Sequence, residues 1–360
     1  MRFWIICLAV LFSSLVSHAQ MPAFTGFGEG FSVQKGSDIV LDNLPRTMSQ
    51  DSIGQCASWA ATAMLQINNC RIKKQNCKDL PESELFSPLD VARFGKKADG
   101  DISYESSYRG ISLDGSTAAL AMEVVGLHVG SAATEACMSL DKVLEKLGGV
   151  TDYAEQSQSD AFDKLKELYA KSQKIDKKCE TCLSKFVDSV DQDICERFNV
   201  KNDPKVLLKA FSEDTFEKFL DQLVSPPECK RAKNRAFFEG KDSMELQSFP
   251  KTEKDKNYKS IVAKIKSVLD QKLPVLIQGI CVTEKKTKKC DSSNSHATVI
   301  TGYSRMCDTA GNCYDALKIQ NSWGETWQKS KNGGWVAADE LLQNTPFQTE
   351  TLTWLQDKPK

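Results

Sequence analysis

The spacing of apolar and polar positions divides the chain into three parts, and the first part is predicted to be helical. Alanines and larger apolar residues run almost without a break over residues 57–67. This run predicts a buried helix beginning at Cys56, and its small side chains would let neighbouring backbone approach closely. Residues 85–90 predict a turn into a short helix, and residues 116–125 predict a further helix that ends at Gly126.

The middle of the chain, at about residues 150–270, is rich in lysine and acidic residues and has apolar positions at helical spacing. Such spacing predicts amphipathic helices that pack one face against the rest of the protein. A lone Cys-x-x-Cys pair, Cys179 and Cys182, lies here. We interpret it as a disulfide within a helical insertion. A zinc site would need a second pair of cysteines, and a redox motif would need a strand before it. The apolar positions are Phe162, Leu165, Leu168, Tyr169, Phe186, Val187, Val190, Ile194 and Phe198.

After Lys272 the hydrophobic period changes to two, and short β-like runs alternate with turns rich in Gly, Asn, Asp and Lys. The predicted strands are residues 274–281, 297–301, 316–320 and 334–337. The expected fold class is therefore α+β. A helical lobe and a sheet lobe would form a cleft between them.

Residues 1–19 have the pattern of a signal peptide that is removed on export. Arg2 precedes an apolar run, and Ser17-His18-Ala19 has small residues at the alternate positions that signal peptidase accepts. A membrane anchor is the alternative, but the run is shorter than the roughly 20 apolar residues that cross a bilayer. We expect a secreted or periplasmic protein whose mature chain is residues 20–360, without a membrane span.

Neither composition nor motif favours a nucleic-acid or nucleotide partner. The chain has 47 Lys and Arg against 48 Asp and Glu, so no excess charge would attract nucleic acid or an anionic membrane surface. A glycine-rich run at residues 26–30 superficially resembles a phosphate-binding loop. No strand precedes it and no helix follows, so we expect residues 20–45 to be a flexible mature N-terminus.

Thirteen cysteines are more than a reduced cytosol usually supports, and export would account for most of them as disulfides. The candidates closest in sequence are Cys70 with Cys77, Cys281 with Cys290, and Cys307 with Cys313, although order alone does not fix connectivity. Eleven cysteines besides Cys56 follow the predicted signal peptide, so at least one of them stays unpaired if Cys56 is a free thiol. The remaining cysteines are Cys137, Cys179, Cys182, Cys195 and Cys229.

Three segments carry the residues that a thiol-nucleophile hydrolase requires. A thiol needs an imidazole to take its proton, and the imidazole needs a third group to orient it. Of the three histidines, His18 lies in the predicted signal peptide and His128 has no partner motif, which leaves His296. The segments are Gln50-Asp51-Ser52-Ile53-Gly54-Gln55-Cys56-Ala57-Ser58-Trp59-Ala60, Ser295-His296-Ala297-Thr298-Val299-Ile300-Thr301-Gly302-Tyr303 and Ile319-Gln320-Asn321-Ser322-Trp323-Gly324.

In their order of glutamine, cysteine, histidine and asparagine, these segments resemble the papain-like cysteine peptidase family, as a bacterial-type secreted member. The asparagine motif with its Ser-Trp-Gly is the most specific part. The cysteine segment departs at Ile53, where many members have a disulfide cysteine, and it lacks the cysteine beside the aromatic Trp59. The resemblance implies a papain-like two-lobe α+β fold, with a helical lobe and an antiparallel sheet or barrel lobe. It implies neither a cofactor nor a metal.

The resemblance also assigns roles. Cys56 would be the nucleophile, His296 its base and acid, and Asn321 the residue that orients the imidazole. Gln50 would donate to the oxyanion together with the Cys56 backbone N–H, and Trp323 resembles the indole that shields the His–Asn hydrogen bond. More loosely, Gly115 and Ser116 lie near the family's glycine pair that hydrogen-bonds the extended substrate backbone.

The spacing of the two principal residues predicts a large insertion. Cys56 and His296 are 240 residues apart (296 − 56), against about 130–150 in familiar members of the family. We place the roughly 100 extra residues in the lysine-rich helical region, as an insertion at about residues 140–255. About 30 residues separate the predicted signal cleavage from Gln50, too few for the family's usual inhibitory N-terminal segment.

The function expected is that of an exported cysteine endopeptidase acting on proteins or peptides. Endopeptidase cleavage is favoured because the mature chain lacks the paired histidines by which some relatives bind a substrate's C-terminal carboxylate. One alternative is a catalytically silent papain-like module that binds a peptide or protein. Another is acyl transfer to an amine with the same residues. The sequence leaves substrate preference open, and a monomer is the expected oligomeric state.

Overall fold

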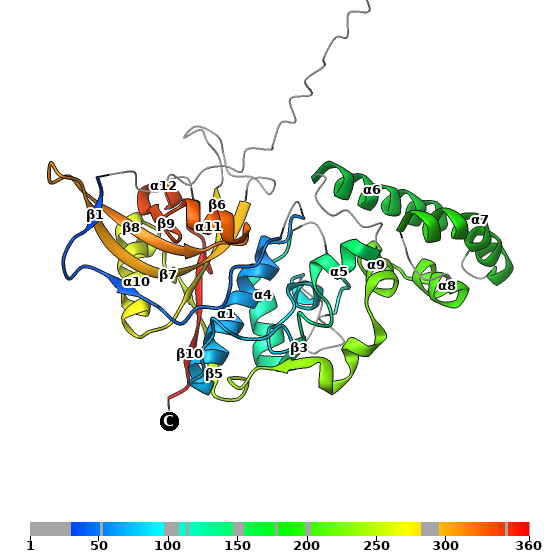
Figure 1. Cartoon of the computed structure of the whole chain (residues 1–360), viewed down its shortest axis with the longest axis horizontal. Helices are drawn as coiled ribbons and strands as arrows, with labels where there is room; N and C mark the ends of the chain where they lie inside the picture. Colours follow the sequence, from blue (N-terminus) through cyan, green and yellow to red (C-terminus); the bar gives the residue numbers. More distant parts are fainter. Residues whose placement is uncertain are drawn as a thin grey trace, which may run out of the picture.

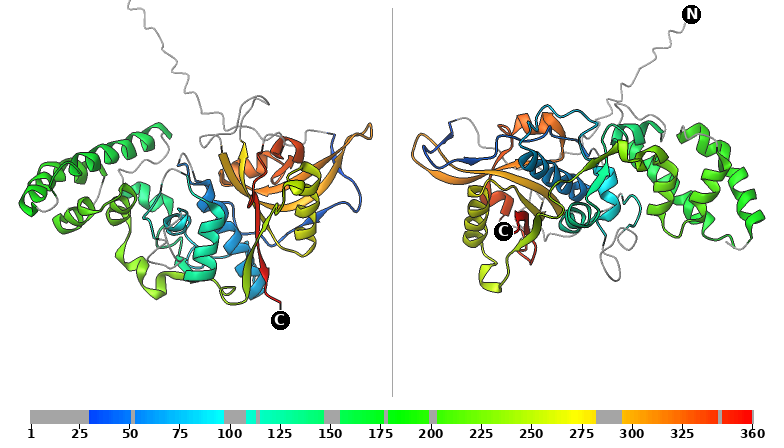
Figure 2. Two further views of the ribbon diagram at one scale, coloured as in Figure 1. Left: turned by 180° about the vertical axis from the view of Figure 1, so that it is seen from behind. Right: turned by 90° about the horizontal axis from the view of Figure 1, so that it is seen from below.

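The computed structural model describes residues 30–50, 53–96, 108–112, 115–146, 155–176, 179–198, 203–281, 295–342 and 345–359. Helices gather on one side of the molecule and an antiparallel sheet lies on the other, as Figure 1 shows. The helices of the middle of the chain extend away from the sheet, which is seen most clearly from behind and below in Figure 2. The α+β class predicted from the hydrophobic pattern is confirmed. The predicted signal peptide, residues 1–19, lies outside the described residues.

The principal sheet is antiparallel, with its strands in the order β5-β10-β6-β7-β8-β9, and β1 and β2 also pair with β7. A separate pair, β3 and β4, lies among the helices. The bounds are β1 Ser32–Val33, β2 Ile39–Val40, β3 Ser131–Ala133, β4 Arg235–Phe237, β5 Met244–Phe249, β6 Val275–Cys281, β7 Ser295–Cys307, β8 Cys313–Gln320, β9 Trp335–Ala337 and β10 Leu352–Asp357.

The strands predicted after Lys272 correspond to β6, β7, β8 and β9. The central strand β7 is buried over most of its length, because α1 and α10 both pack against it. The sequence reading missed β5 and β10, which pair with each other over residues 244–249 and 352–357. β5 lies in a region whose composition favoured helix, so its strand conformation depends on pairing with a strand about 100 residues away.

The helices divide between those that pack on the sheet and those of the middle region. The α-helices are α1 Cys56–Lys73, α2 Pro88–Val91, α4 Ala118–Glu123, α5 Leu140–Lys146, α6 Glu155–Ser172, α7 Glu180–Phe198, α8 Pro204–Ser212, α9 Phe216–Val224, α10 Tyr258–Asp270, α11 Gly324–Ser330 and α12 Ala338–Leu342. A π-helical stretch, η2, spans Val124–Val129, and short 3-10 helices are η1 Ala92–Phe94, η3 Pro227–Lys230, η4 Ala232–Asn234 and η5 Glu253–Asp255.

α1 begins at Cys56, as predicted, and its alanines explain how close it lies to the sheet. Ala57, Ala60 and Ala61 are buried in one apolar cluster with Ala297 and Val299 of β7. Because these side chains are small, the helix backbone approaches the strand closely. A cysteine on the first turn of α1 and a histidine at the start of β7 are thereby carried toward each other.

The helix predicted to end at Gly126 continues past it, and this expectation was wrong. α4 passes into η2, which ends at Val129 and is capped by Gly130, a residue with φ +78° in the left-handed region. A Cβ on Gly126 would lie 2.7 Å from Leu65 Cδ2, so the glycine there permits close packing on α1. Gly130 supplies the terminating conformation instead.

Residues 20–45 were predicted to be flexible, and the structure corrects this for the part that it describes. β1 and β2 pair with β7 at Cys307 to Met306 and at Tyr303 to Gly302. The Leu41 N–H also donates to the Thr301 carbonyl at 2.9 Å. The ordering comes from the open edge of β7, which the local sequence of the segment does not reveal. Gly26 to Glu29 of the glycine-rich run lie outside the described residues.

Disulfides join Cys70 to Cys77 and Cys307 to Cys313, which confirms two of the three predicted local pairs. Cys281 is disulfide-bonded, and its predicted partner Cys290 lies outside the described residues. The Cys-x-x-Cys pair, Cys179–Cys182, is a disulfide as predicted, and Cys137 is bonded to Cys229. Cys56 is the free cysteine among the side chains that the structure describes.

The helices α6 to α9 build a second apolar cluster that continues into the first lobe. It joins Phe211, Phe219 and Leu220 with Trp59 and Ile111. The insertion proposed at about residues 140–255 stays a prediction; within that range the helices run from α5 to α9, and β5 belongs to the principal sheet.

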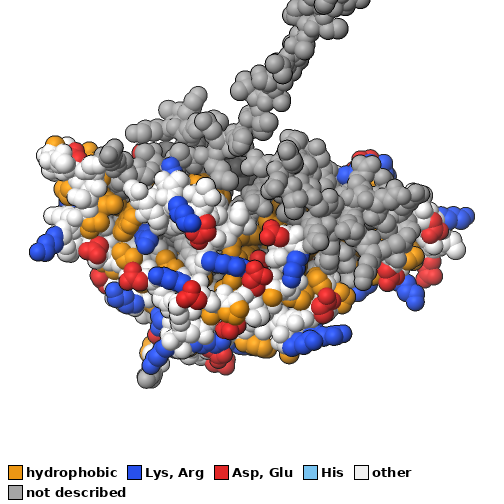
Figure 3. All heavy atoms as spheres, viewed as in Figure 1, with side chains coloured by type: hydrophobic (Ala, Val, Ile, Leu, Met, Phe, Trp, Pro, Cys, Tyr) orange, Lys and Arg blue, Asp and Glu red, His pale blue; other side chains and the backbone are white. Residues whose placement is uncertain are grey.

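The distribution of surface charge and the length of the helices are relevant to two kinds of partner, nucleic acid and membrane. On the face drawn in Figure 3, basic and acidic side chains are interspersed rather than gathered by sign. Within the described ranges, none of the helices combines the length and the apolarity that crossing a bilayer requires.

Candidate active site

Cys56 is the first residue of α1, so its side chain lies at the positive end of the helix dipole. The residue before it, Gln55, makes no side-chain capping hydrogen bond, which leaves the N–H groups of the first turn directed toward this end. The Cys56 thiol is half-buried. It accepts hydrogen bonds from the backbone N–H groups of Ala57 and Ala297.

His296 is the second residue of β7 and is only 5% exposed. Its Nε2 lies 2.7 Å from Oδ1 of Asn321, the residue that follows β8. Antiparallel pairing of β7 with β8 places the start of one strand beside the end of the other, which is why residues 25 positions apart meet. Since a carboxamide oxygen only accepts, Nε2 donates, and Nδ1 is left for the hydrogen bond with Cys56.

The thiol and the imidazole shift each other's pKa in opposite directions. Burial acts to raise the pKa of the Cys56 thiol, but the charge on His296 and the hydrogen bonds to the sulfur outweigh it and lower that pKa. Burial acts to lower the pKa of His296, but the Cys56 thiolate and the hydrogen bonds from both partners raise it. Both directions favour a thiolate–imidazolium pair.

Trp323 covers the histidine ring. The centroids of the two rings are 4.8 Å apart and the planes are tilted by 30°. Trp327, on α11, packs edge-on against Trp323 at 5.3 Å. The paired indoles help to keep water from the buried hydrogen bond between His296 and Asn321.

Gln50 is held by both of its amide atoms. Its Oε1 accepts a hydrogen bond from the Ser322 hydroxyl, and its Nε2 donates to the Ile53 carbonyl at 2.7 Å. The Gln50 backbone N–H also donates to the Ser322 carbonyl at 2.9 Å. A carboxamide nitrogen carries two hydrogens, so one of them remains for an acceptor in the site. The asparagine motif therefore fixes the glutamine as well as the histidine.

Gly115 lies beside the loop that precedes the cysteine, and Ser116 follows it in the chain. The Gly115 N–H donates to the carbonyl of Gly54 at 3.0 Å, two residues before Cys56. Gly115 has φ +57° and is exposed, while Ser116 is half-buried. The structure thus places Cys56, His296 and Asn321 together and holds Gln50 against Ser322. A substrate-binding role of Gly115 and Ser116 stays a prediction.

A cavity lies behind the site, between α1 and the sheet. Trp59, Ala60 and Gln66 of α1 line one side, and Thr298 and Asn321 line the other. The Trp59 Nε1–H donates to the Ser49 carbonyl at 3.0 Å, which fixes the chain just ahead of Gln50.

No metal centre was predicted for this protein. Among the described residues, no group of three or more His, Cys, Asp and Glu side chains is placed to hold a metal ion. His128, the other histidine that the structure describes, lies on η2 with Nε2 4.0 Å from Glu123 Oε1.

Ser322 is a residue of the candidate site that the sequence did not predict. It stands in the asparagine motif between Asn321 and Trp323, and only the structure shows that its hydroxyl holds the Gln50 amide. Its position inside the most specific motif is the feature of the sequence that could have indicated a role in the site.

No protein-family model and no curated protein matches the sequence. Among solved structures, the SERA5 proenzyme of Plasmodium falciparum is 11% identical with a TM-score of 0.40, and the match covers 87% of this chain and 62% of that one. The present chain thus spans less than two thirds of that proenzyme.

Two further solved structures are similar. Bromelain of Ananas comosus, in complex with the E64 inhibitor, is 13% identical with a TM-score of 0.39, covering 90% of this chain and 99% of that one. Xylellain, a cysteine protease from Xylella fastidiosa, is 15% identical with a TM-score of 0.38, covering 91% of each chain. Likenesses of this size leave the function to be argued from the site itself.

Proposed function

We propose that this chain is an exported, papain-like cysteine endopeptidase that hydrolyses peptide bonds through an acyl-enzyme intermediate. One observation carries the proposal. The free thiol of Cys56 is hydrogen-bonded to the ring of His296, whose Nε2 is held by Asn321. A module that only binds peptides has no need of a thiol whose pKa is lowered by a neighbouring imidazolium.

The reaction follows from the order of the three groups. The Cys56 thiolate attacks the scissile carbonyl carbon, and the developing oxyanion accepts hydrogen bonds from the Gln50 amide and the Cys56 backbone N–H. The His296 imidazolium gives its proton to the leaving amine. The same ring then takes a proton from water as that water attacks the thioester, which releases the acid and restores the Cys56 thiolate beside the His296 imidazolium. Asn321 holds the ring in the orientation that both steps require.

The disulfides support export as part of the proposal. The bonds Cys70–Cys77, Cys137–Cys229 and Cys307–Cys313 would persist in an oxidising compartment. Proteins or peptides are the proposed substrates. Cleavage within a chain is proposed because binding of a substrate's C-terminal carboxylate by paired histidines would need two histidines besides His296, and residues 20–360 contain one.

Covalent labelling tests the function directly. An epoxysuccinyl inhibitor, applied under reducing and mildly acidic conditions, is expected to add one molecule to the native protein at Cys56, located by peptide mass spectrometry. Cys56→Ala is the matched control and is expected to take up none. Failure of the native protein to react, with its fold confirmed by circular dichroism, would contradict the enzyme assignment and favour the silent binding module.

The pH dependence of alkylation is expected to change when His296 is removed. In the native protein the reactive thiolate persists as pH falls below the ordinary thiol pKa, because the pKa of Cys56 is lowered, and it is lost only as pH falls through that lowered value. In His296→Ala the principal lowering cause is gone and burial remains, so the midpoint moves upward.

Rates of iodoacetamide reaction measured across pH would show this shift, with His128→Ala as the control that leaves the profile unchanged. Hydrolysis should also fall on the alkaline side, as pH rises through the raised pKa of His296. Coincident midpoints in the native protein and His296→Ala would refute the ion pair.

Gln50→Ala is expected to lower kcat for peptide hydrolysis by about 100-fold or more, the usual effect of removing one oxyanion donor. Ser322→Ala is expected to have a smaller effect, about 10-fold, because the amide remains but loses the hydrogen bond that orients it. Steady-state kinetics of both variants would check the order. A Ser322→Ala loss equal to or larger than that of Gln50→Ala would contradict the proposed division of roles.

A further inference from the structure

Residues 108–112 and 115–117, here called the cleft segment, contain the predicted substrate-binding positions Gly115 and Ser116. Three backbone hydrogen bonds hold this segment to the first lobe. They run from the N–H groups of Arg109, Gly115 and Thr117 to the carbonyls of Arg93, Gly54 and Gly95, at 2.9, 3.0 and 2.7 Å respectively. The segment is therefore fixed at one end beside the loop that carries Cys56.

The other side of the cleft segment is held by α9, which belongs to the helical middle region. The Ile111 N–H donates to the Glu217 carbonyl at 3.1 Å. Gly110 has φ +79°, and a Cβ there would collide with the backbone of Glu217 and Lys218. This position thus requires glycine both for its conformation and for its close contact with α9.

Side chains reinforce the same contact. The Tyr108 hydroxyl hydrogen-bonds to Asp221 on α9, and Arg93 donates to the Asp221 carboxylate from both Nε and Nη2. Lys96 Nζ pairs with Glu217 Oε1 at 2.6 Å. Ile111 is 1% exposed in an apolar cluster that includes Leu220 of α9.

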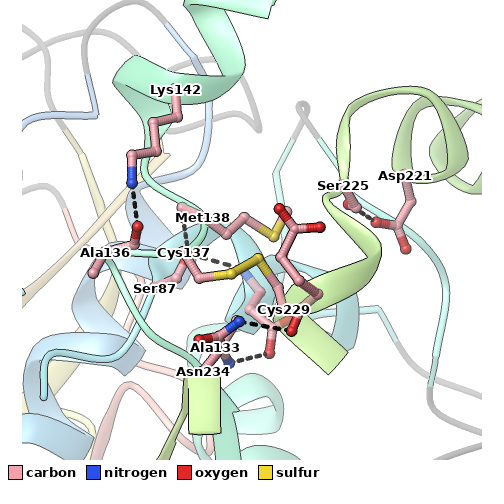
Figure 4. The surroundings of a disulfide bond; sticks show 12 residues. Ser87, Ala133, Ala136, Cys137, Met138, Lys142, Asp221, Ser225, Cys229 and Asn234 are labelled. Atoms are coloured by element: carbon pink, nitrogen blue, oxygen red, sulfur yellow. Dashed lines mark hydrogen bonds between the residues drawn. A yellow bond between two sulfur atoms is a disulfide. The ribbon is translucent and has the colours of Figure 1, made fainter. Parts of the chain in front are cut away.

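A disulfide fixes the C-terminal end of α9 to the first lobe, independently of the cleft segment. Cys137, which follows β3, is bonded to Cys229, which follows α9. Figure 4 shows this disulfide and, near it, the end of α9 with Asp221 and Ser225. With α9 tied to the first lobe at its end, its first turns form a fixed surface against which the cleft segment lies.

We infer that α9 is a positioning element for substrate: it holds the cleft segment, through Gly110, Tyr108 and Ile111, in the conformation that binds an extended peptide. The inference rests on the proposed function and assigns the middle region a part in it. Loss of the contact should weaken the binding of extended peptides and leave the thiolate–imidazolium pair intact, because Cys56 and His296 are held by α1, β7 and β8.

Gly110→Ala is the principal test, and Gly36→Ala is its matched control. Gly36 has φ +77°, like Gly110, but a Cβ there would meet no atom within 4 Å. The two variants therefore share the backbone cost, and only the first disturbs α9. Tyr108→Phe is a milder second variant, which keeps the ring beside Phe94 and removes the hydrogen bond to Asp221.

Three readouts separate the possibilities. KM for denatured casein is expected to rise at least 10-fold in Gly110→Ala and about threefold in Tyr108→Phe. In both, kcat for a single-residue p-nitrophenyl ester and the iodoacetamide rate of Cys56 should stay within twofold of native. Gly36→Ala should match the native protein throughout, and melting temperatures would verify that each variant is folded.

A binding measurement keeps this inference distinct from the proposed enzyme function. Fluorescein-labelled denatured casein is titrated against Cys56→Ala and against Cys56→Ala with Gly110→Ala, followed by fluorescence polarisation. At least 10-fold weaker binding by the double variant supports the inference even if the native protein proves inactive. Equal affinities, or no binding by either protein, would overturn it, as would a fall in the iodoacetamide rate parallel to the rise in KM.

Discussion

His296→Ala is expected to lower kcat/KM for peptide hydrolysis by about 10,000-fold or more, which is the scale seen when a member of a catalytic triad is removed. The ring takes part in three steps: it holds the thiolate, protonates the leaving amine and activates water. No neighbour can replace it, because the described part of the chain contains one other histidine, His128, which lies on η2 with its Nε2 4.0 Å from Oε1 of Glu123.

The measurement is the steady-state rate on denatured casein, with His128→Ala as the control for loss of an imidazole elsewhere. The control is expected to retain native activity. A residual rate in His296→Ala within 10-fold of the native rate would show that another group serves as the base, and the mechanism proposed for this site would be wrong.

Arg93→Met is expected to lower the free energy of unfolding by about 3–5 kcal/mol, because it leaves the buried Asp221 carboxylate without its cation. The Arg93 side chain is 5% exposed and lies between Asp90 and Asp221, which are 1% and 4% exposed. Burial acts to raise the pKa of Asp221, but Arg93 outweighs it and lowers that pKa. Without the guanidinium, the cost of keeping this carboxylate ionised and buried is no longer offset.

Urea unfolding at neutral pH would measure the loss, with Arg46→Met as the control. Arg46 pairs with Glu82, but the two side chains are 42% and 52% exposed, so that variant should cost no more than about 1 kcal/mol. Since the lowered pKa of Asp221 stabilises the native fold above the unfolded-state pKa, the Arg93 contribution should shrink as pH falls through the folded-state value. Equal losses for the two variants would contradict the buried network.

The residues of the candidate site could be predicted because each sits in a short motif whose chemistry is local. Cys56 precedes an alanine-rich helix, and the alanines explain both the helix and its close approach to β7. Asn321 follows an alternating strand, and His296 starts another. Antiparallel pairing of β7 and β8 then brings the two residues together, so the order of the motifs along the chain was enough to predict that they are neighbours.

Other features depended on contacts between distant residues. The end of the helix containing Gly126 was misplaced because a glycine signals either termination or close packing, and only the position of Leu65 decides between them. The order of residues 30–41 comes from the edge of β7, and β5 and β10 each depend on the other for pairing. The role of Ser322 required knowing that Gln50 lies beside it.

What the sequence determined by itself was the chemistry and its placement on elements: a thiol at a helix start, an imidazole and a carboxamide at strand ends, and an α+β class. Hydrophobic period and motif spacing encode these directly, because they reflect interactions between residues close in the chain. Only the tertiary structure decided how α9 lies against the cleft segment, since the pairing of Asp221 with Arg93 and of Glu217 with Ile111 joins residues more than 100 positions apart. Contacts at that separation leave no periodic signal, so only the packed molecule shows them.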